Sequence, residues 1–157
     1  MQYIEKYKKI RASIHKINSG IQELRNLKVT RTVKLTSEIG EWLVNEIYQG
    51  KMATSSTQKG WDIKADGKRI QVKAHAKRKD NTAQWTVCNY NEQLFEEFVI
   101  VVFSEDYRLK KIIKLSFEEL MKKSNKSGNR RIIYWKDCIQ NEINLDTLDP
   151  HLLHIFK

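Results

Sequence analysis

Residues 61–74 read WDIKADGKRIQVKA, and this pattern predicts a β-hairpin. The pair Asp66-Gly67 is a strong signal for a two-residue turn, because both residue types tolerate the left-handed backbone that such turns require. We therefore expect one strand over 61–65 and a return strand over 68–74. Apolar and polar residues alternate along the return strand, so the apolar set should face the core and the polar set the opposite side of the sheet. The apolar set is Ile70, Val72 and Ala74, and the polar set is Arg69, Gln71 and Lys73.

Two helices are predicted before this hairpin. Near the start of the chain, apolar residues recur at steps of three and four and draw one stripe along a helix of about 25 residues. The stripe consists of Tyr7, Ile10, Ile14, Ile17, Ile21 and Leu24. It either packs on the protein's own core or forms a helical arm, residues 1–30, that pairs with a second copy of the chain. The second helix should be capped by Thr36 and Ser37, run to about Tyr48 and stop at Gly50.

The segments after the hairpin complete a predicted α/β fold. A third strand over 84–88 and a short helix near 91–97 lead to residues 98–103, which are apolar at every position, as in a strand buried on both faces of its sheet. Residues 104–157 predict C-terminal β/α additions. These comprise strands near 109–115 and 130–135, a helix opened by the capping box Ser116-Phe117-Glu118-Glu119, a mobile basic loop over 122–131, and a short terminal helix capped by Asp149-Pro150.

Composition indicates the domain count and the class of partner. The chain has 157 residues, of which 40% are hydrophobic, and this fits a single domain, 1–157. Its 29 Lys and Arg against 19 Asp and Glu leave a net charge of +10, which favours polyanions such as DNA, with a merely solvated basic surface as the alternative. No apolar run spans a bilayer and no secretory signal opens the chain, so we expect no membrane partner and a cytoplasmic location. Cys88 and Cys138 match no zinc spacing and are expected to be reduced, packed thiols.

Three residues of the hairpin carry groups suited to phosphodiester hydrolysis. Asp62 lies at the head of one strand, and Gln71 and Lys73 lie two apart on its partner, so their side chains can converge at one end of the sheet. This hydrolysis needs oxygen ligands for a hard divalent cation, which lowers the pKa of a bound water and neutralises charge in the transition state. Asp62 is the best candidate for the central ligand. Lys73 can orient or deprotonate the attacking water and stabilise developing negative charge.

The same pattern resembles the signature of the PD-(D/E)XK nuclease superfamily. Residues 60–62 (Gly-Trp-Asp) followed by 71–73 (Gln-Val-Lys) are similar to an acidic residue, a β-turn and an acid-x-lysine motif on the next strand. Residues 40–41 (Gly-Glu) resemble the helical glutamate that many members carry before that motif. The predicted order of elements is similar to the αβββαβ core of these enzymes over residues 36–103. The resemblance implies a restriction-endonuclease-like fold with a mixed sheet.

The resemblance also implies an activity and a metal site. A Mg²⁺-dependent DNA endonuclease is expected, with Mn²⁺ as a substitute metal and restriction among its conceivable roles. Asp62, Gln71 and Glu41 would bind the metal, with Glu38 as the alternative to Glu41, and Lys73 would complete the catalytic set. Gln71 departs from the family pattern, because an acidic residue is commoner there and an amide brings no charge to the metal. A non-cleaving nucleic-acid-binding module of the same fold is therefore the alternative function.

Basic residues near the motif predict contacts to DNA phosphates. The candidates are Lys59, Lys64, His75, Lys77, Arg78 and Lys79. His75 shares the strand face of Gln71 and Lys73 by alternation, although a histidine in this position is more commonly an ordinary surface residue. A homodimer is also expected, since one site of this kind faces one strand and two copies related by a two-fold axis can cut a duplex. A protein that only assembles through its N-terminal helix is a third possibility.

Overall fold

The predicted hairpin is present and lies in a five-stranded mixed sheet. The computed structural model describes residues 2–32, 34–55, 60–89 and 93–157. The hairpin consists of β2 (Ile63–Ala65) and β3 (Lys68–Lys77), and Asp66 (φ 50°) and Gly67 (φ 75°) both adopt the left-handed backbone expected at the turn. The sheet order is β1-β2-β3-β5-β6, with β1 over Lys51–Met52, β5 over Glu97–Ser104 and β6 over Leu109–Ser116. β3 and β5 run parallel, whereas the other neighbours are antiparallel.

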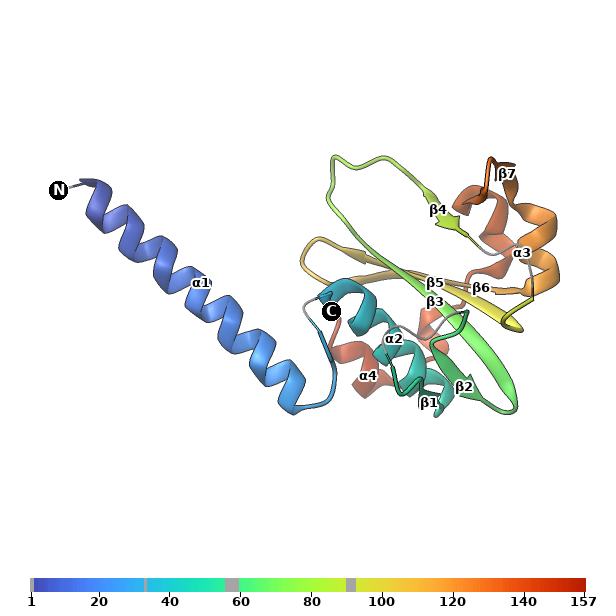
Figure 1. Ribbon diagram of the computed structural model, residues 1–157, viewed down its shortest axis with the longest axis horizontal. Coiled ribbons are helices and arrows are strands. Elements are labelled where there is room, and N and C mark those ends of the chain that lie inside the picture. Colours follow the sequence, from blue (N-terminus) through green and yellow to red (C-terminus); the bar gives the residue numbers. More distant parts are fainter. Residues whose placement is uncertain (1, 33, 56–59, 90–92) are drawn as a thin grey trace.

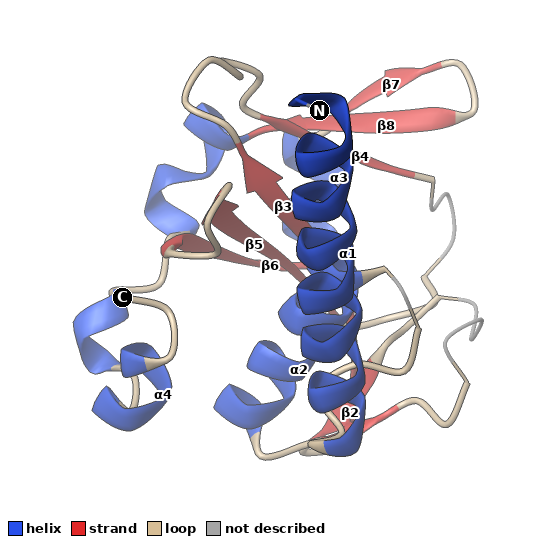
Figure 2. Cartoon of the chain, turned by 90° about the vertical axis from the view of Figure 1, so that its left-hand side faces the viewer, coloured by secondary structure: helices blue, strands red, loops and turns tan. Residues whose placement is uncertain are grey.

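Helices cover one face of this sheet and a second, three-stranded sheet covers the other (Figures 1 and 2). The helical side consists of α2 (Leu35–Tyr48) and α4 (Pro150–His154). The opposite side consists of the strands β4 (Trp85–Cys88), β7 (Asn125–Ser127) and β8 (Arg130–Tyr134), together with the helix α3 (Phe117–Lys123). Two short 3-10 helices, η1 (Trp135–Asn141) and η2 (Leu145–Thr147), link β8 to α4.

Each face of the main sheet buries its own apolar core, and β5 contributes to both. Val99, Val101 and Phe103 pack on the helical side, whereas Phe98, Ile100 and Val102 pack under the second sheet. This arrangement explains why 98–103 is apolar at every position and confirms the prediction of a strand buried on both faces.

Two elements of the predicted core differ from the expectation. The strand predicted over 84–88 forms as β4, but it pairs with β8 in the second sheet, and its buried Thr86 and Cys88 face the main sheet from above. The position beside β2 is taken by β1. The helix predicted near 91–97 is absent from its described part, because 93–96 is irregular and Glu97 opens β5, whereas 91–92 lies outside the described residues. Alternation predicts a half-buried strand but not the strand with which it pairs.

The C-terminal additions follow their local signals closely. Ser116 and Glu119 form the predicted capping box at α3, and the Asp149 side chain accepts a hydrogen bond from the backbone N–H of His151 at the start of α4. The segment 122–131, predicted to be a mobile loop, instead contains the end of α3, all of β7 and the start of β8. The hairpin of β7 and β8 turns at Gly128, whose φ of 61° favours glycine.

The start of α2 corrects the predicted cap. The helix begins at Leu35, so Thr36 and Ser37 lie inside its first turn. The cap position is Lys34, two residues before Thr36, and it makes no side-chain capping hydrogen bond. Instead, the Glu38 carboxylate accepts hydrogen bonds from the backbone N–H groups of the preceding connection. At the other end, Gln49 takes the left-handed conformation and Gly50 follows it.

The helix α1 (Gln2–Asn26) projects away from the two sheets (Figure 1). The apolar stripe on its outer half is exposed, since Ile10, Ile14 and Ile17 retain 45%, 53% and 60% of their accessible surface. Ile21 and Leu24 are half-buried nearer the body. The stripe therefore packs on the protein's own core at one end only. In the part of the chain that the structure describes, no helix is long and apolar enough to cross a membrane.

Candidate active site

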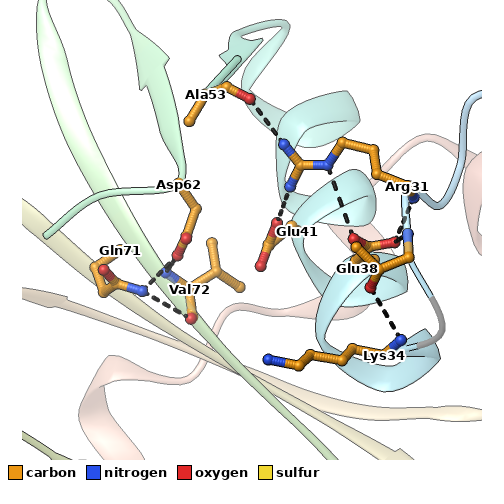
Figure 3. Close-up of polar contacts among 9 residues, drawn as sticks. Arg31, Lys34, Glu38, Glu41, Ala53, Asp62, Gln71 and Val72 are labelled. Carbon is orange, nitrogen blue, oxygen red and sulfur yellow. Dashed lines mark hydrogen bonds and ion pairs between the residues drawn. The ribbon is translucent and has the colours of Figure 1, made fainter. Parts of the chain in front are cut away.

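The carboxylate of Asp62 lies where the two strands of the hairpin separate. The ladder between β2 and β3 ends at Ile70, whose carbonyl accepts the backbone N–H of Asp62 at 2.8 Å. Beyond that point β3 remains paired with β5 on one edge, but it has no strand partner on the β2 side, where the side chain of Asp62 takes the place of the missing strand. Its Oδ2 accepts the backbone N–H of Val72 at 2.7 Å and the side-chain amide N–H of Gln71 at 2.5 Å (Figure 3). The sequence thus places Asp62 and Gln71 together, as predicted.

Close packing of α2 on β3 brings a second carboxylate to this position. A Cβ added at Gly40 would overlap the Cβ of Ala74, so the helix and the strand approach to a distance that only glycine allows. Glu41, the next residue, consequently faces the end of the hairpin. Its Oε2 accepts from the Arg31 guanidinium at 2.7 Å, and Figure 3 shows Glu41 between Arg31 and Asp62.

The two carboxylates are held in an electrostatically costly arrangement. Burial, and then the charge of Asp62, raises the pKa of Glu41 to about 7, although Arg31 and Lys73 act in the opposite direction. Burial also raises the pKa of Asp62, against the stabilising effects of the Val72 N–H, Lys73 and Arg31. Lys73 therefore acts on both carboxylates. Two partly buried acids that share too little positive charge favour the binding of a further cation.

The donor set fits a hard divalent cation. No group of three or more His, Cys, Asp and Glu residues is placed to hold a metal ion in the described ranges. The candidate set is instead two carboxylates and one amide, Asp62, Glu41 and Gln71, and both kinds of oxygen ligate Mg²⁺ or Ca²⁺. The amide of Gln71 now donates to Asp62 and to the Val72 carbonyl, so its oxygen would have to turn toward Asp62 in order to ligate.

Of the two helical glutamates that the sequence offered, Glu41 is the one coupled to Asp62. Glu38 is only 3% exposed, and its Oε2 accepts the backbone N–H groups of Arg31 and Thr32. That carboxylate fastens the connection between α1 and α2. Its role is therefore local and structural.

Arg31 belongs to this site and was not predicted. Its guanidinium donates to the Ala53 carbonyl at 2.8 Å and to Glu41, and Nε lies 3.9 Å from Glu38 (Figure 3). It thereby joins the α1–α2 connection, α2 and the segment after β1. One sequence signal could have found it: a cation just before a helix N-terminus opposes the helix dipole, and so favours a carboxylate partner.

His75, a predicted DNA contact, is half-buried and contacts residues of the protein's own interior. Its Nε2 lies 2.8 Å from the Thr86 hydroxyl, and its ring centroid is 5.4 Å from that of Trp135. Burial, followed by the charges of Lys77 and Lys73, lowers the pKa of His75 to about 4. It is therefore a neutral residue packed beneath the second sheet.

The other predicted DNA contacts lie in two places. Lys64 is exposed on β2, with Nζ 4.8 Å from the centre of the Trp61 ring, close to Asp62 in the chain. Lys77, Arg78 and Lys79 lie at the far end of β3, where Lys77 is half-buried over Trp135 and the other two are exposed. Lys59 lies outside the described residues.

Comparison with known protein families and with curated proteins identifies no relative of this chain. No model of a known protein family matches the chain, and no curated protein matches its sequence. The chemistry of the site is therefore argued from the contacts above.

Proposed function

We propose that the chain is a cytoplasmic, Mg²⁺-dependent DNA endonuclease with a restriction-endonuclease-like core. One observation carries the proposal. Asp62 from the hairpin and Glu41 from α2 are placed so that the charge of Asp62 raises the pKa of Glu41, and Lys73 interacts electrostatically with both. A carboxylate whose pKa is raised by burial and by a neighbouring carboxylate, within the electrostatic influence of a lysine, is typical of catalytic sites, because folding alone gains nothing from such crowding.

The residues have distinct chemical roles in this proposal. Asp62 and Glu41 would bind Mg²⁺, or Mn²⁺ in its place, with the amide oxygen of Gln71 as a third ligand. The bound metal would supply a water of lowered pKa and a Lewis acid for the phosphate. Lys73, whose charge lowers the pKa of both carboxylates, would contact the scissile phosphate and orient the attacking water.

The arrangement of the elements supports the proposed core. α2, β2, β3 and the parallel β5 follow one another as in the family pattern, and the motif residues lie at the point where β2 and β3 diverge. Two elements differ: β4 belongs to the second sheet, and the helix of the family pattern before β5 is absent from residues 93–96, the described part of that segment.

A DNA-binding module that does not cleave is the second candidate. It is favoured by the Gln71 amide, which brings no charge and donates its N–H to Asp62. A metal would have to displace this hydrogen bond in order to recruit the amide oxygen, which lowers its affinity.

Incubation with supercoiled plasmid and short duplex DNA decides between these candidates. Reactions contain Mg²⁺, Mn²⁺ or a chelator, and binding is followed in parallel by fluorescence anisotropy. Cuts that need metal and disappear with the chelator support the nuclease, whereas binding without cuts in either metal supports the module. If the protein neither binds nor cuts, both candidates are wrong.

We also propose that two copies of the chain pair through α1. The exposed stripe offers a continuous apolar surface, and two sites related by a two-fold axis would cut both strands. Light scattering of the intact protein tests this directly: Ile14→Glu should give a monomer, whereas Ala12→Glu, on the opposite side of the helix, should leave the dimer. A monomeric wild-type protein would contradict the proposal.

A further inference from the structure

A basic cleft of about 580 Å³ lies at the far end of β3 and β5, away from Asp62. Its walls are the β3–β4 connection and the turn between β5 and β6, and Phe103 and Trp135 line it more deeply. Five cations and one acid line it: Lys77, Lys79, Arg108, Lys110, Lys111 and Asp106. None of the C-terminal cations among them was singled out in the sequence.

The positive charge of this cleft is only partly neutralised. Asp106 accepts from Arg108 at 2.9 Å and from the Ser104 hydroxyl, and Lys111 donates to Glu142 at 2.7 Å. Lys79 and Lys110 are exposed and form no ion pair with the described residues. A surplus of exposed cations along two facing segments suits an extended polyanion better than one small anion, which would require convergent buried donors.

The cleft and the candidate active site lie along one strand. Lys73 and Lys77 project from the same face of β3, four residues apart, which corresponds to about 13 Å at the rise of a β-strand. Each strand of B-DNA carries one phosphate per roughly 3.4 Å of helix axis, so that span corresponds to about four phosphates.

We propose that this cleft binds the phosphate backbone of DNA about four phosphates to one side of the scissile bond. The inference rests on the proposed nuclease function for the position of the scissile bond. The binding itself is sequence-independent, because backbone contacts position the duplex without reading its bases. The cleft thereby fixes how the duplex lies across Asp62 and Lys73.

Binding measured in a chelator tests the cleft separately from cleavage. The variant K79E/K110E is compared with K122E/K126E, which changes the net charge equally on α3 and β7, at the other end of the body (Figure 1). With a duplex of two helical turns, the slope of log K against log salt concentration should fall by about two for the cleft variant and by much less for the control. Affinity near physiological salt should fall about tenfold or more in the cleft variant alone.

A second arm places the contact relative to the cut. Once the cleaved bond is mapped in Mg²⁺, neutral methylphosphonates are introduced about four phosphates from it on either side. Methylphosphonates on one of the two sides should weaken cleavage by the wild type but not by K79E/K110E. Equal salt slopes for the two double variants, or no binding by the wild type, would overturn the inference. Cleft-dependent binding without any cleavage would instead refute only the nuclease.

Discussion

Two clusters of polar side chains lie at different points along β3, and they are built in opposite ways. Around His75, the Thr86 hydroxyl contacts the imidazole at 2.8 Å and accepts from the Trp135 indole at 2.9 Å, so each group has a partner and the histidine is neutral. Around Asp62, two carboxylates are crowded, and the pKa of each is raised. The polar groups around His75 are paired and neutral, as expected of a cluster that serves the fold, whereas the electrostatic cost of the Asp62 cluster supports the proposal that it binds a ligand.

The largest effect is expected from Asp62→Asn. The amide oxygen can still accept from Val72 and Gln71, and the repulsion between Asp62 and Glu41 disappears, so the fold should be as stable as the wild type or more stable. Metal-dependent cleavage should fall by about a thousandfold or more, because the central anionic ligand is lost. Chemical denaturation and plasmid cleavage on the same samples measure both quantities.

Asp66→Asn is the matched control for this prediction. It makes the same chemical change on the same hairpin, at the exposed turn, where asparagine also tolerates a positive φ. Cleavage by this variant should stay near that of the wild type. Cleavage by Asp62→Asn at a similar rate would show that the active site lies elsewhere.

A substitution in the His75 cluster should lower the folding stability and leave cleavage nearly unchanged, which is the reverse of the effect of Asp62→Asn. Thr86→Val keeps the shape of the side chain but leaves the Trp135 indole and the His75 ring without their common partner, at a cost of about 2–4 kcal/mol of folding stability. Cleavage per folded molecule should change little. The exposed Thr82→Val serves as control and should shift stability by less than about 0.5 kcal/mol. A stable Thr86→Val variant would contradict the structural role of this cluster.

Stability of the metal-free protein should depend on pH through Glu41. Folded Glu41 keeps its proton until about pH 7, whereas the unfolded chain releases it near pH 4.5, so this residue destabilises the fold as the pH rises through that window. His75 acts in reverse, because its pKa is lowered from 6.5 to about 4 and acidification through that range destabilises the fold. Glu41→Gln removes only the first effect, and its stability relative to the wild type should grow toward pH 7, by about 3 kcal/mol at most.

Urea denaturation in a chelator at several pH values measures this difference. Glu41 is well shielded, with 14% of its side chain exposed, so solvent screens the effect little. The exposed Glu118→Gln controls for the loss of a carboxylate. A constant difference between Glu41→Gln and the wild type across the range would contradict the crowding of Glu41 and Asp62.

The sequence predicts the local elements of this fold better than their partners. The Asp66-Gly67 turn, the capping box of α3 and the apolar run of β5 depend on short-range chemistry, and all are present. The pairing of β4 with β8 joins residues about 45 positions apart, and nothing in a four-residue alternation specifies that partner. The helix predicted before β5 failed for a similar reason, since a few polar residues carry no periodicity that distinguishes a helix from a loop.

In the candidate site, too, the sequence predicts the residues that are placed by local structure and misses those that are placed by tertiary contacts. Asp62, Gln71 and Lys73 lie on one hairpin, so register alone places them together. Arg31 reaches Glu41 only through a connection whose path is fixed by the Glu38 carboxylate, and this tertiary contact has no local pattern. Alternation also predicted the face of His75 correctly but not its burial, because the cover comes from β4 in the second sheet.

The smallest and most informative effect is expected from Gln71→Glu, which makes the costly cluster still more acidic. Gln71 is only 4% exposed, and its amide donates to Asp62, so the metal-free variant loses a hydrogen bond and gains a third acid, at a cost of about 1–2 kcal/mol. A third carboxylate suits a hard cation, so Mg²⁺ or Mn²⁺ affinity should rise, by about tenfold at most. Calorimetric titration compares it with Gln140→Glu, which adds the same charge at an exposed position. Tighter metal binding with lower metal-free stability would show that the Asp62 cluster, unlike the His75 cluster, is built for a ligand. Affinity no higher than that of Gln140→Glu would exclude position 71 from the metal site and favour the module that binds DNA without cutting it.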